Sequence, residues 1–134
     1  MNTTYFLNLV AGNVFGTKTT PAIPATYYIG LSSTTPAIDG TNVTEPSGGG
    51  YARVAFNASM SEPTNGVITN ETVVTFPKST ADWGVMTHFV VYDTATGGNL
   101  LLYNAMSRSR TVEADNIMMA EPGAITLSVV NVTA

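Results

Sequence analysis

Apolar and polar residues alternate with two different periods along this chain, and the change comes near residue 20. Before it, apolar side chains recur at helical spacing, at Tyr5, Phe6, Leu9, Val10 and Val14. Thr3 or Thr4 can cap the start of this segment, and Gly16 can end it. We therefore expect one short helix over about residues 4–16, followed by extended chain.

After residue 20 the pattern is that of short strands, rich in aromatic and β-branched residues and separated by turns. The predicted strands are Thr26–Ser33, Tyr51–Asn57, Val67–Asn70, Thr72–Phe76, Met86–Asp93, Asn99–Met106, Thr111–Ala114, Ile117–Ala120 and Ala124–Val132. Asn65-Gly66 is a strong signal for a tight turn, and Thr94–Gly98 is typical of a hairpin loop. About eight such strands predict an all-β fold: an antiparallel, jelly-roll-like β-sandwich with one short N-terminal helix, in a single domain over residues 1–134.

The clearest strand pattern is Met86–Asp93. Phe89 and Val91 fall on one predicted face. The other face carries Met86, His88, Val90 and Tyr92. Both faces are largely apolar, so we expect this strand to lie in the centre of its sheet.

Composition narrows the possible functions. The 134 residues include no Cys, one His and only 10 % charged side chains, with a net charge of −4. Without cysteine the chain has neither disulfides nor thiolate chemistry. Five Lys and Arg residues cannot neutralise many phosphates, which argues against nucleic-acid and anionic-membrane partners. Few charges combined with many Thr, Asn and Gly residues favour a module buried within a larger assembly.

We expect neither a membrane-spanning nor a secretory segment. No stretch approaches the ~20 apolar residues that a transmembrane helix needs. The apolar run Tyr5–Val10 is not preceded by a basic region, which a signal peptide would have. We expect synthesis in a cytoplasm.

Candidate chemistry is scarce. His88 is the single histidine, and within a strand it is more typical of a ring packed beside the core than of a metal ligand. The carboxylates fall almost entirely in loops and turns, and Gly48–Gly50 lacks the Lys and the following helix of a phosphate-binding loop. We therefore assign no catalytic, cofactor-binding or metal residues and expect no enzymatic activity.

Two groups of side chains each allow two interpretations. Ser107–Arg110 is either a basic patch for an acidic partner or a loop kept soluble by its charges, and we favour the loop. Trp83 and five tyrosines could form a platform that stacks on sugars, or could fill the core and cross-strand pairs, which we favour. The tyrosines are Tyr27, Tyr28, Tyr51, Tyr92 and Tyr103.

Several short motifs together resemble a known family. They are Tyr28–Ser33 (YIGLSS), Gly48–Arg53 (GGGYAR), Phe76–Gly84 (FPKSTADWG), Thr87–Phe89 (THF), Tyr92-Asp93 and Thr96–Leu101 (TGGNLL). The chain resembles, over roughly residues 5 to 132, a family of small bacteriophage virion proteins labelled tail-fibre or minor structural proteins. The resemblance brings no catalytic residues with it.

This resemblance implies a non-enzymatic structural protein of the phage particle. We expect a symmetric homo-oligomer, such as a trimer, attached to the capsid as a decoration protein or to the tail as a fibre or fibre adaptor. Its partners would be the major capsid protein or tail proteins, and its helix either docks on a partner or covers the sheet. The alternative function is a carbohydrate-binding module that uses Trp83 and loop tyrosines on host-surface glycans.

Overall fold

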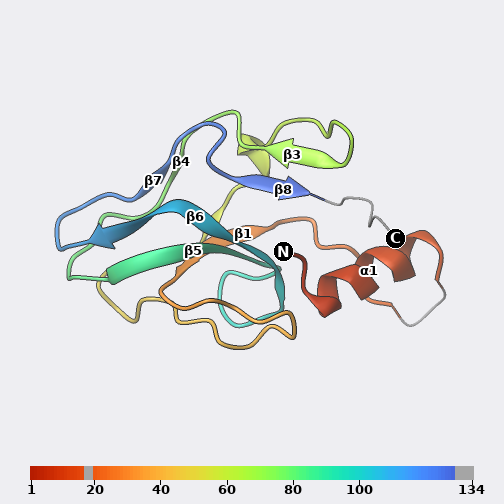
Figure 1. Ribbon diagram of the computed structural model, residues 1–134, viewed down its shortest axis with the longest axis horizontal. Coiled ribbons are helices and arrows are strands. Elements are labelled where there is room, and N and C mark those ends of the chain that lie inside the picture. Colours follow the sequence, from red (N-terminus) through yellow and green to blue (C-terminus); the bar gives the residue numbers. More distant parts are fainter. Residues whose placement is uncertain (17–19, 129–134) are drawn as a thin grey trace.

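The computed structural model describes residues 1–16 and 20–128 (Figure 1). Its central element is a four-stranded antiparallel sheet with the strand order β2-β1-β5-β6. These strands are β1 (Tyr28–Ser32), β2 (Val54–Ala55), β5 (Gly84–Tyr92) and β6 (Leu100–Val112). The prediction that the clearest strand lies in the centre is confirmed, because β5 pairs with β1 on one side and with β6 on the other.

Two short ribbons form the second layer over one face of this sheet. The pairs are β3 (Val67–Thr69) with β8 (Thr126–Ser128), and β4 (Val74–Thr75) with β7 (Met119–Ala120). Asn65 and Gly66 both have positive φ in the turn before β3, as the Asn-Gly signal predicts. The main core fills the space between the sheet and the ribbons. The expected all-β, sandwich-like fold is confirmed, and its second layer is two separate ribbons.

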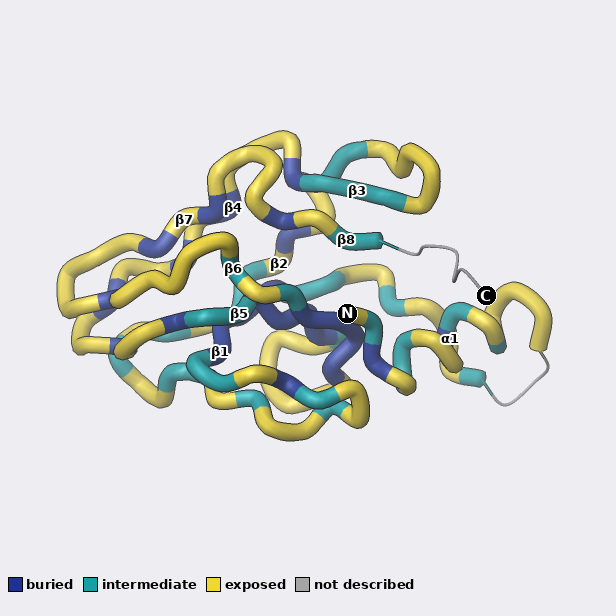
Figure 2. Tube along the Cα trace, viewed as in Figure 1, coloured by how far each residue is buried: buried dark blue, intermediate teal, exposed yellow. Residues whose placement is uncertain are grey.

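The other face of the sheet carries a smaller core. Val90, Tyr92, Leu100 and Tyr103 pack together there, and Val43 from the long loop after β1 packs against them. Figure 2 shows that the buried positions concentrate in β1, β5 and the first half of β6. The sheet is therefore covered on both faces in this region.

An irregularity in β5 corrects one predicted face. A register shift separates Met86 from His88. Met86 lies in the main core with Phe89, while Val90 and Tyr92 lie in the second cluster. The prediction that Met86 shares a face with Val90 and Tyr92 was wrong, because a bulge interrupts the period-two alternation.

Strand β6 corrects a second prediction. Ser107–Arg110, which we expected to be a loop, lies inside this 13-residue strand. The strand also includes the first half of the segment predicted as Thr111–Ala114, because Thr111 and Val112 pair with β5. Pairing with a strong central strand outweighs the polar composition of the segment.

The remaining predicted strands are shorter in the structure. Of Tyr51–Asn57 only Val54–Ala55 is strand, because the chain turns into a 3-10 helix over Asn57–Ser59. The last predicted strand, Ala124–Val132, is observed as β8, and its residues after 128 lie outside the described part of the chain.

Helix α1 (Thr4–Val14) lies at one end of the sheet (Figure 1). The Thr3 hydroxyl accepts a hydrogen bond from the Phe6 N–H, which confirms one of the two expected caps. Phe15 is the residue that ends the helix, so the prediction over residues 4–16 was about one half-turn too long. The buried Thr3 hydroxyl also donates to backbone carbonyls of β6, which fastens the start of the helix to the sheet.

Candidate functional site

The family-like motifs meet in one place, around an ion pair between Arg53 and Glu45. The Arg53 Nη2 lies 2.7 Å from Glu45 Oε2, and the Arg53 Nε donates to Glu45 Oε1 at 2.9 Å. This two-bonded geometry matches the planar guanidinium to the carboxylate. The side chains are only 7 % (Arg53) and 22 % (Glu45) exposed, so the pair is largely withdrawn from water.

Tyr51 joins the ion pair to strand β1. Its hydroxyl donates to Glu45 Oε1 at 2.6 Å and accepts from the Leu31 N–H at 3.0 Å. A Cβ on Gly30 would lie 2.5 Å from the Tyr51 oxygen and 2.7 Å from Glu45 Oε1. The glycine in YIGLSS therefore leaves room for the side chains that follow it in the long loop.

Arg53 also ties this loop to the β5–β6 hairpin. Its Nη1 donates to the backbone oxygens of Thr94 and Gly97, and its guanidinium carbon lies 3.5 Å from the centroid of the Tyr92 ring. One cation–π contact and four charge-assisted hydrogen bonds therefore hold the guanidinium in place. The GGGYAR arginine thus holds together two segments that are about forty residues apart.

Trp83 completes the arrangement on the other side of Tyr51. Its Nε1 donates to the Gly49 carbonyl at 2.8 Å, and its ring meets that of Tyr51 edge-on at 5.3 Å between centroids. Gly49 has a positive φ, which glycine adopts without strain. We call Gly30, Glu45, Tyr51, Arg53, Trp83 and Tyr92 the motif cluster.

The side chains of the motif cluster are arranged to hold loops in place. Burial, and the hydrogen bond to Glu45, raise the pKa of the Tyr51 hydroxyl far above its ordinary value, so it stays protonated. Among the described residues, no buried side-chain donor or acceptor lacks a partner. A group that is protonated, buried and fully hydrogen-bonded has neither the free lone pair nor the access that a catalytic base or nucleophile needs.

His88 behaves as a residue beside the core. Its Nδ1 lies 2.8 Å from the Thr87 hydroxyl, and partial burial lowers the pKa of its imidazole. This confirms the prediction of a ring that packs at the core edge and hydrogen-bonds a neighbour. In residues 1–16 and 20–128, no three His, Asp or Glu side chains gather closely enough to hold a metal ion.

The carboxylates predicted to lie in turns are found there, and several of them cap backbone groups. Asp93 accepts from the backbone and side-chain N–H groups of Asn99, which closes the Thr94–Gly98 hairpin loop. Asp39 accepts from the Thr41 N–H and hydroxyl in the same way, and these bonds lower its pKa. Such bonds are the ordinary work of aspartate in turns.

Five of the six aromatic side chains that could have formed a sugar platform lie in the core or pack against it, as we favoured, and the sixth, Tyr28, is half-buried on β1. Trp83 is 7 % exposed, and Tyr92 and Tyr103 are also buried. An indole that is covered on its faces and bound through its N–H presents no platform to a sugar ring. The structure therefore gives no support to stacking on Trp83.

Comparison with known families gives the motifs their context. A family model described as podophage GP4 fiber I protein gp80 matches residues 2–128. The chain belongs to this family. The match confirms the resemblance to phage fibre and minor structural proteins, and it spans both the motif cluster and α1. Among curated proteins, none matches the chain.

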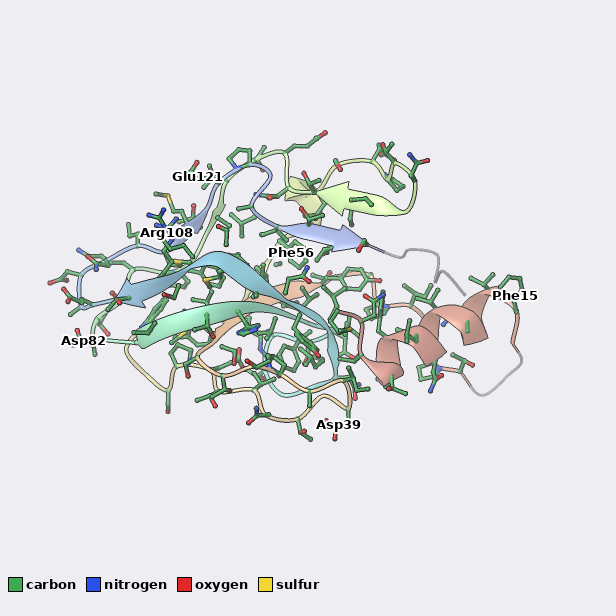
Figure 3. The ribbon with its side chains drawn as sticks, viewed as in Figure 1. Phe15, Asp39, Phe56, Asp82, Arg108 and Glu121 are labelled. Carbon is green, nitrogen blue, oxygen red and sulfur yellow. The ribbon has the colours of Figure 1, made fainter. Side chains whose placement is uncertain are left out.

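Within this fibre family member, α1 and its C-terminal cap carry three exposed large apolar side chains. The helix carries no charged residue, and Leu7, Val14 and Phe15 are exposed, Phe15 by 89 % (Figure 3). Only Leu9 of the helix is buried. None of the described helices is long and apolar enough to cross a membrane.

An apolar cavity of about 370 Å³ lies between the start of α1 and the β3–β8 ribbon. Its lining includes Phe6, Phe56, Met60, Leu102 and Leu127, and it contains no charged side chain. Sequence reasoning did not identify this cavity, because its residues come from segments that are distant in the chain and share no motif. Its lining offers shape and apolar surface rather than chemistry.

Proposed function

We propose that this chain is a non-enzymatic structural module of a podophage fibre, which works as a symmetric oligomer and is held to neighbouring virion proteins through α1. The observation that carries the proposal is the fibre-family match over residues 2–128. The fully hydrogen-bonded motif cluster supports it, because the residues that define the resemblance are used to hold loops in place. The family description favours a fibre over a capsid decoration.

The proposed role of α1 follows from which of its side chains are buried and which are exposed. Thr3 and Leu9 are buried against the sheet, so the first half of the element covers the body of the protein. Leu7, Val14 and Phe15 point away from it without any charged neighbour on the helix. An exposed, uncharged apolar face is typical of a surface that is buried in an assembly.

Quantitative mass spectrometry of purified particles, referenced to the major capsid protein, tests the location. A fibre component predicts a few to a few dozen copies for each particle. Hundreds of copies, in a simple ratio to the capsid protein, would instead assign the chain to the shell. Absence from the particle would overturn the proposal.

A matched pair of substitutions tests α1. Phe15→Asp places a charge on the exposed helix end, and the control Ile117→Asp places the same charge on an exposed apolar residue in a loop outside α1. We expect Phe15→Asp to reduce incorporation into particles while both variants remain folded by circular dichroism. Equal incorporation of the two variants would rule out docking through α1.

A further inference from the structure

The apolar cavity between the start of α1 and the β3–β8 ribbon is lined by both buried and half-buried side chains. Phe56 and Leu102 are buried in the main core. Phe6, Met60 and Leu127 are only half-buried, although they pack against the same core. At about 30 Å³ for each water molecule, a volume of about 370 Å³ would hold about a dozen waters against an uncharged lining. Covering the half-buried side chains with a further apolar segment is therefore favourable.

Strand β8 ends at this cavity. Its last two residues, Leu127 and Ser128, both line the cavity. Ser128 is held there from two sides, because it pairs with Val67 of β3 and its carbonyl accepts a hydrogen bond from Asn2 Nδ2 at 3.3 Å. In Figure 1 the β8 arrow points toward the end of the molecule that carries α1. Since Phe6 of α1 also lines the cavity, a chain that continues in this direction passes along it.

The residues that follow Ser128 have the composition that this lining requires. Residues 129–134 read VVNVTA and include no charged side chain. Four of the six are β-branched, which favours an extended chain: Val129, Val130, Val132 and Thr133. At about 3.3 Å for each residue, four extended residues span about 13 Å. The segment is therefore suited to lie along an apolar cavity as an extension of β8.

The alternation along β8 indicates which of these side chains enters the cavity. Ile125 is buried in the main core and Leu127 packs against it, whereas Thr126 between them is exposed. Successive side chains of a strand point to opposite faces, so a continued strand places Val129 on the face of Leu127. Val130 falls on the other face, with Thr126.

We propose that residues 129–132 continue β8 within the same chain and cover the cavity, with the Val129 side chain inside it. Because the segment starts at Ser128, its effective concentration at the cavity exceeds that of a segment from another molecule. A separate molecule would also lose translational and rotational freedom on binding. The alternative occupants are the same residues of a second copy and an apolar segment of another virion protein.

This inference goes beyond the proposed function and does not depend on it. It concerns a contact within one chain, which is measured on the purified full chain in the absence of particles. The number of copies in the particle and the docking of α1 concern contacts between chains. Each proposal can therefore fail without the other.

Methyl NMR of the full chain tests the contact directly. In a chain with labelled valine and methionine methyl groups, we expect nuclear Overhauser contacts from Val129 to the Met60 methyl group and to the Phe6 ring. Val129→Ala removes the Val129 methyl signals and so assigns them. The Met60 contact should be absent from a mixture of copies labelled only on valine and copies labelled only on methionine, because it arises within one chain.

Two NMR results would overturn the proposal. A contact between Val129 and Met60 in the mixture of singly labelled copies would show that a second copy supplies the segment. If neither the uniform sample nor the mixture shows a contact to Met60 or Phe6, residues 129–132 do not occupy the cavity, which would then be open to another virion protein.

A matched pair of substitutions tests which side chain enters the cavity. Val129→Asp should raise the equilibrium constant for unfolding in urea about tenfold or more, because a carboxylate replaces a buried valine. Val130→Asp places the same charge one residue further along, on the exposed face, and should change this constant by less than about twofold. Equal effects of the two substitutions would contradict the proposed alternation.

Removal of residues 129–134 is the second variant. A chain that stops at Ser128 should unfold about as readily as Val129→Asp, because it loses the same buried side chain. It should also bind more of the apolar dye ANS than the full chain, since the cavity is then uncovered. A shortened chain with the stability and the dye binding of the full chain would overturn the proposal.

Discussion

The motif cluster and the β6 edge, which is residues 105–111 of the outer strand of the sheet, use arginine in opposite ways. Arg53 of the motif cluster is buried, paired with a carboxylate, stacked on an aromatic ring and bonded to two carbonyls. Arg108 and Arg110 of the edge are exposed, and neither forms an ion pair with a described carboxylate. Arg53, whose hydrogen bonds are made within the chain, lies in a family-like motif. Arg108 and Arg110 lie in none of these motifs.

The residues that identify the family are therefore different from the residues that are free to contact a partner. Side chains with every hydrogen bond used inside the chain stabilise the fold but have nothing left for a partner. The exposed side chains of the β6 edge and of α1 contribute little to the fold and remain available. The two regions should therefore respond differently to substitution.

The largest effect should come from breaking the buried ion pair. Arg53→Ala leaves Glu45 without its guanidinium and removes the contacts to Thr94, Gly97 and Tyr92. We expect the free energy of unfolding to fall by about 3 kcal/mol in urea denaturation, the usual cost of orphaning one member of a buried pair. Lys78→Ala, which removes an exposed pair, should cost less than about 0.5 kcal/mol. Equal losses would show that the buried and the exposed ion pair contribute equally to stability.

Gly30→Ala should have the next largest effect. The added methyl group meets the Tyr51 oxygen and Glu45 Oε1, both fixed by their own hydrogen bonds. We expect a loss of about 2 kcal/mol, as for overpacked cores. In the Tyr51→Phe background the additional loss should be smaller, since the nearest atom is gone. A loss of the same size in both backgrounds would show that Tyr51 does not set the requirement for glycine.

Acidification should reveal a smaller effect at His88. Partial burial lowers the pKa of His88 below its ordinary value of 6.5, so the folded state favours the neutral ring. This contribution is present above the unfolded pKa and is lost as the pH falls through the lowered folded pKa. In thermal melts from pH 7.5 to 5, His88→Gln should lose less stability than the natural chain. If the melting temperatures of the two chains fall in parallel with pH, His88 does not contribute to the pH dependence of stability.

The smallest change in stability should come from the exposed regions. Phe15→Asp and Arg108→Ala each alter a side chain with few contacts, so each should shift the free energy of unfolding by less than about 0.5 kcal/mol. Urea denaturation measures this directly. A loss comparable to that of Arg53→Ala would show that these surfaces belong to the fold after all.

Local patterns predicted the elements better than their extents. The spacing of apolar residues and a capping threonine located α1, and the apolar run before Asp93 located β5. The bulge at Met86 was not predictable, because it depends on which residues of β6 pair with β5. Ser107–Arg110 looked like a loop for the same reason, since its strand structure comes from a neighbour that is distant in sequence.

The motif cluster shows the same limit at the level of side chains. The motifs identified the family, and their residue types suggested core packing for the aromatic side chains. The pairing of Arg53 with Glu45, and the need for Gly30 beneath them, depend on how the long loop folds back over β1. Nothing in the spacing of those three residues specifies that path.

The central claim is that partners bind the exposed regions and leave the motif cluster unchanged. Hydrogen exchange of backbone amides, measured for the dilute chain and for the chain within purified particles, tests this claim most directly. If partners bind the exposed regions, exchange should slow in α1 and in residues 105–111 of β6. Residues 48–53, which include Tyr51 and Arg53 of the motif cluster, should exchange equally in both states. Slower exchange confined to residues 48–53, with α1 and β6 unchanged, would contradict the account.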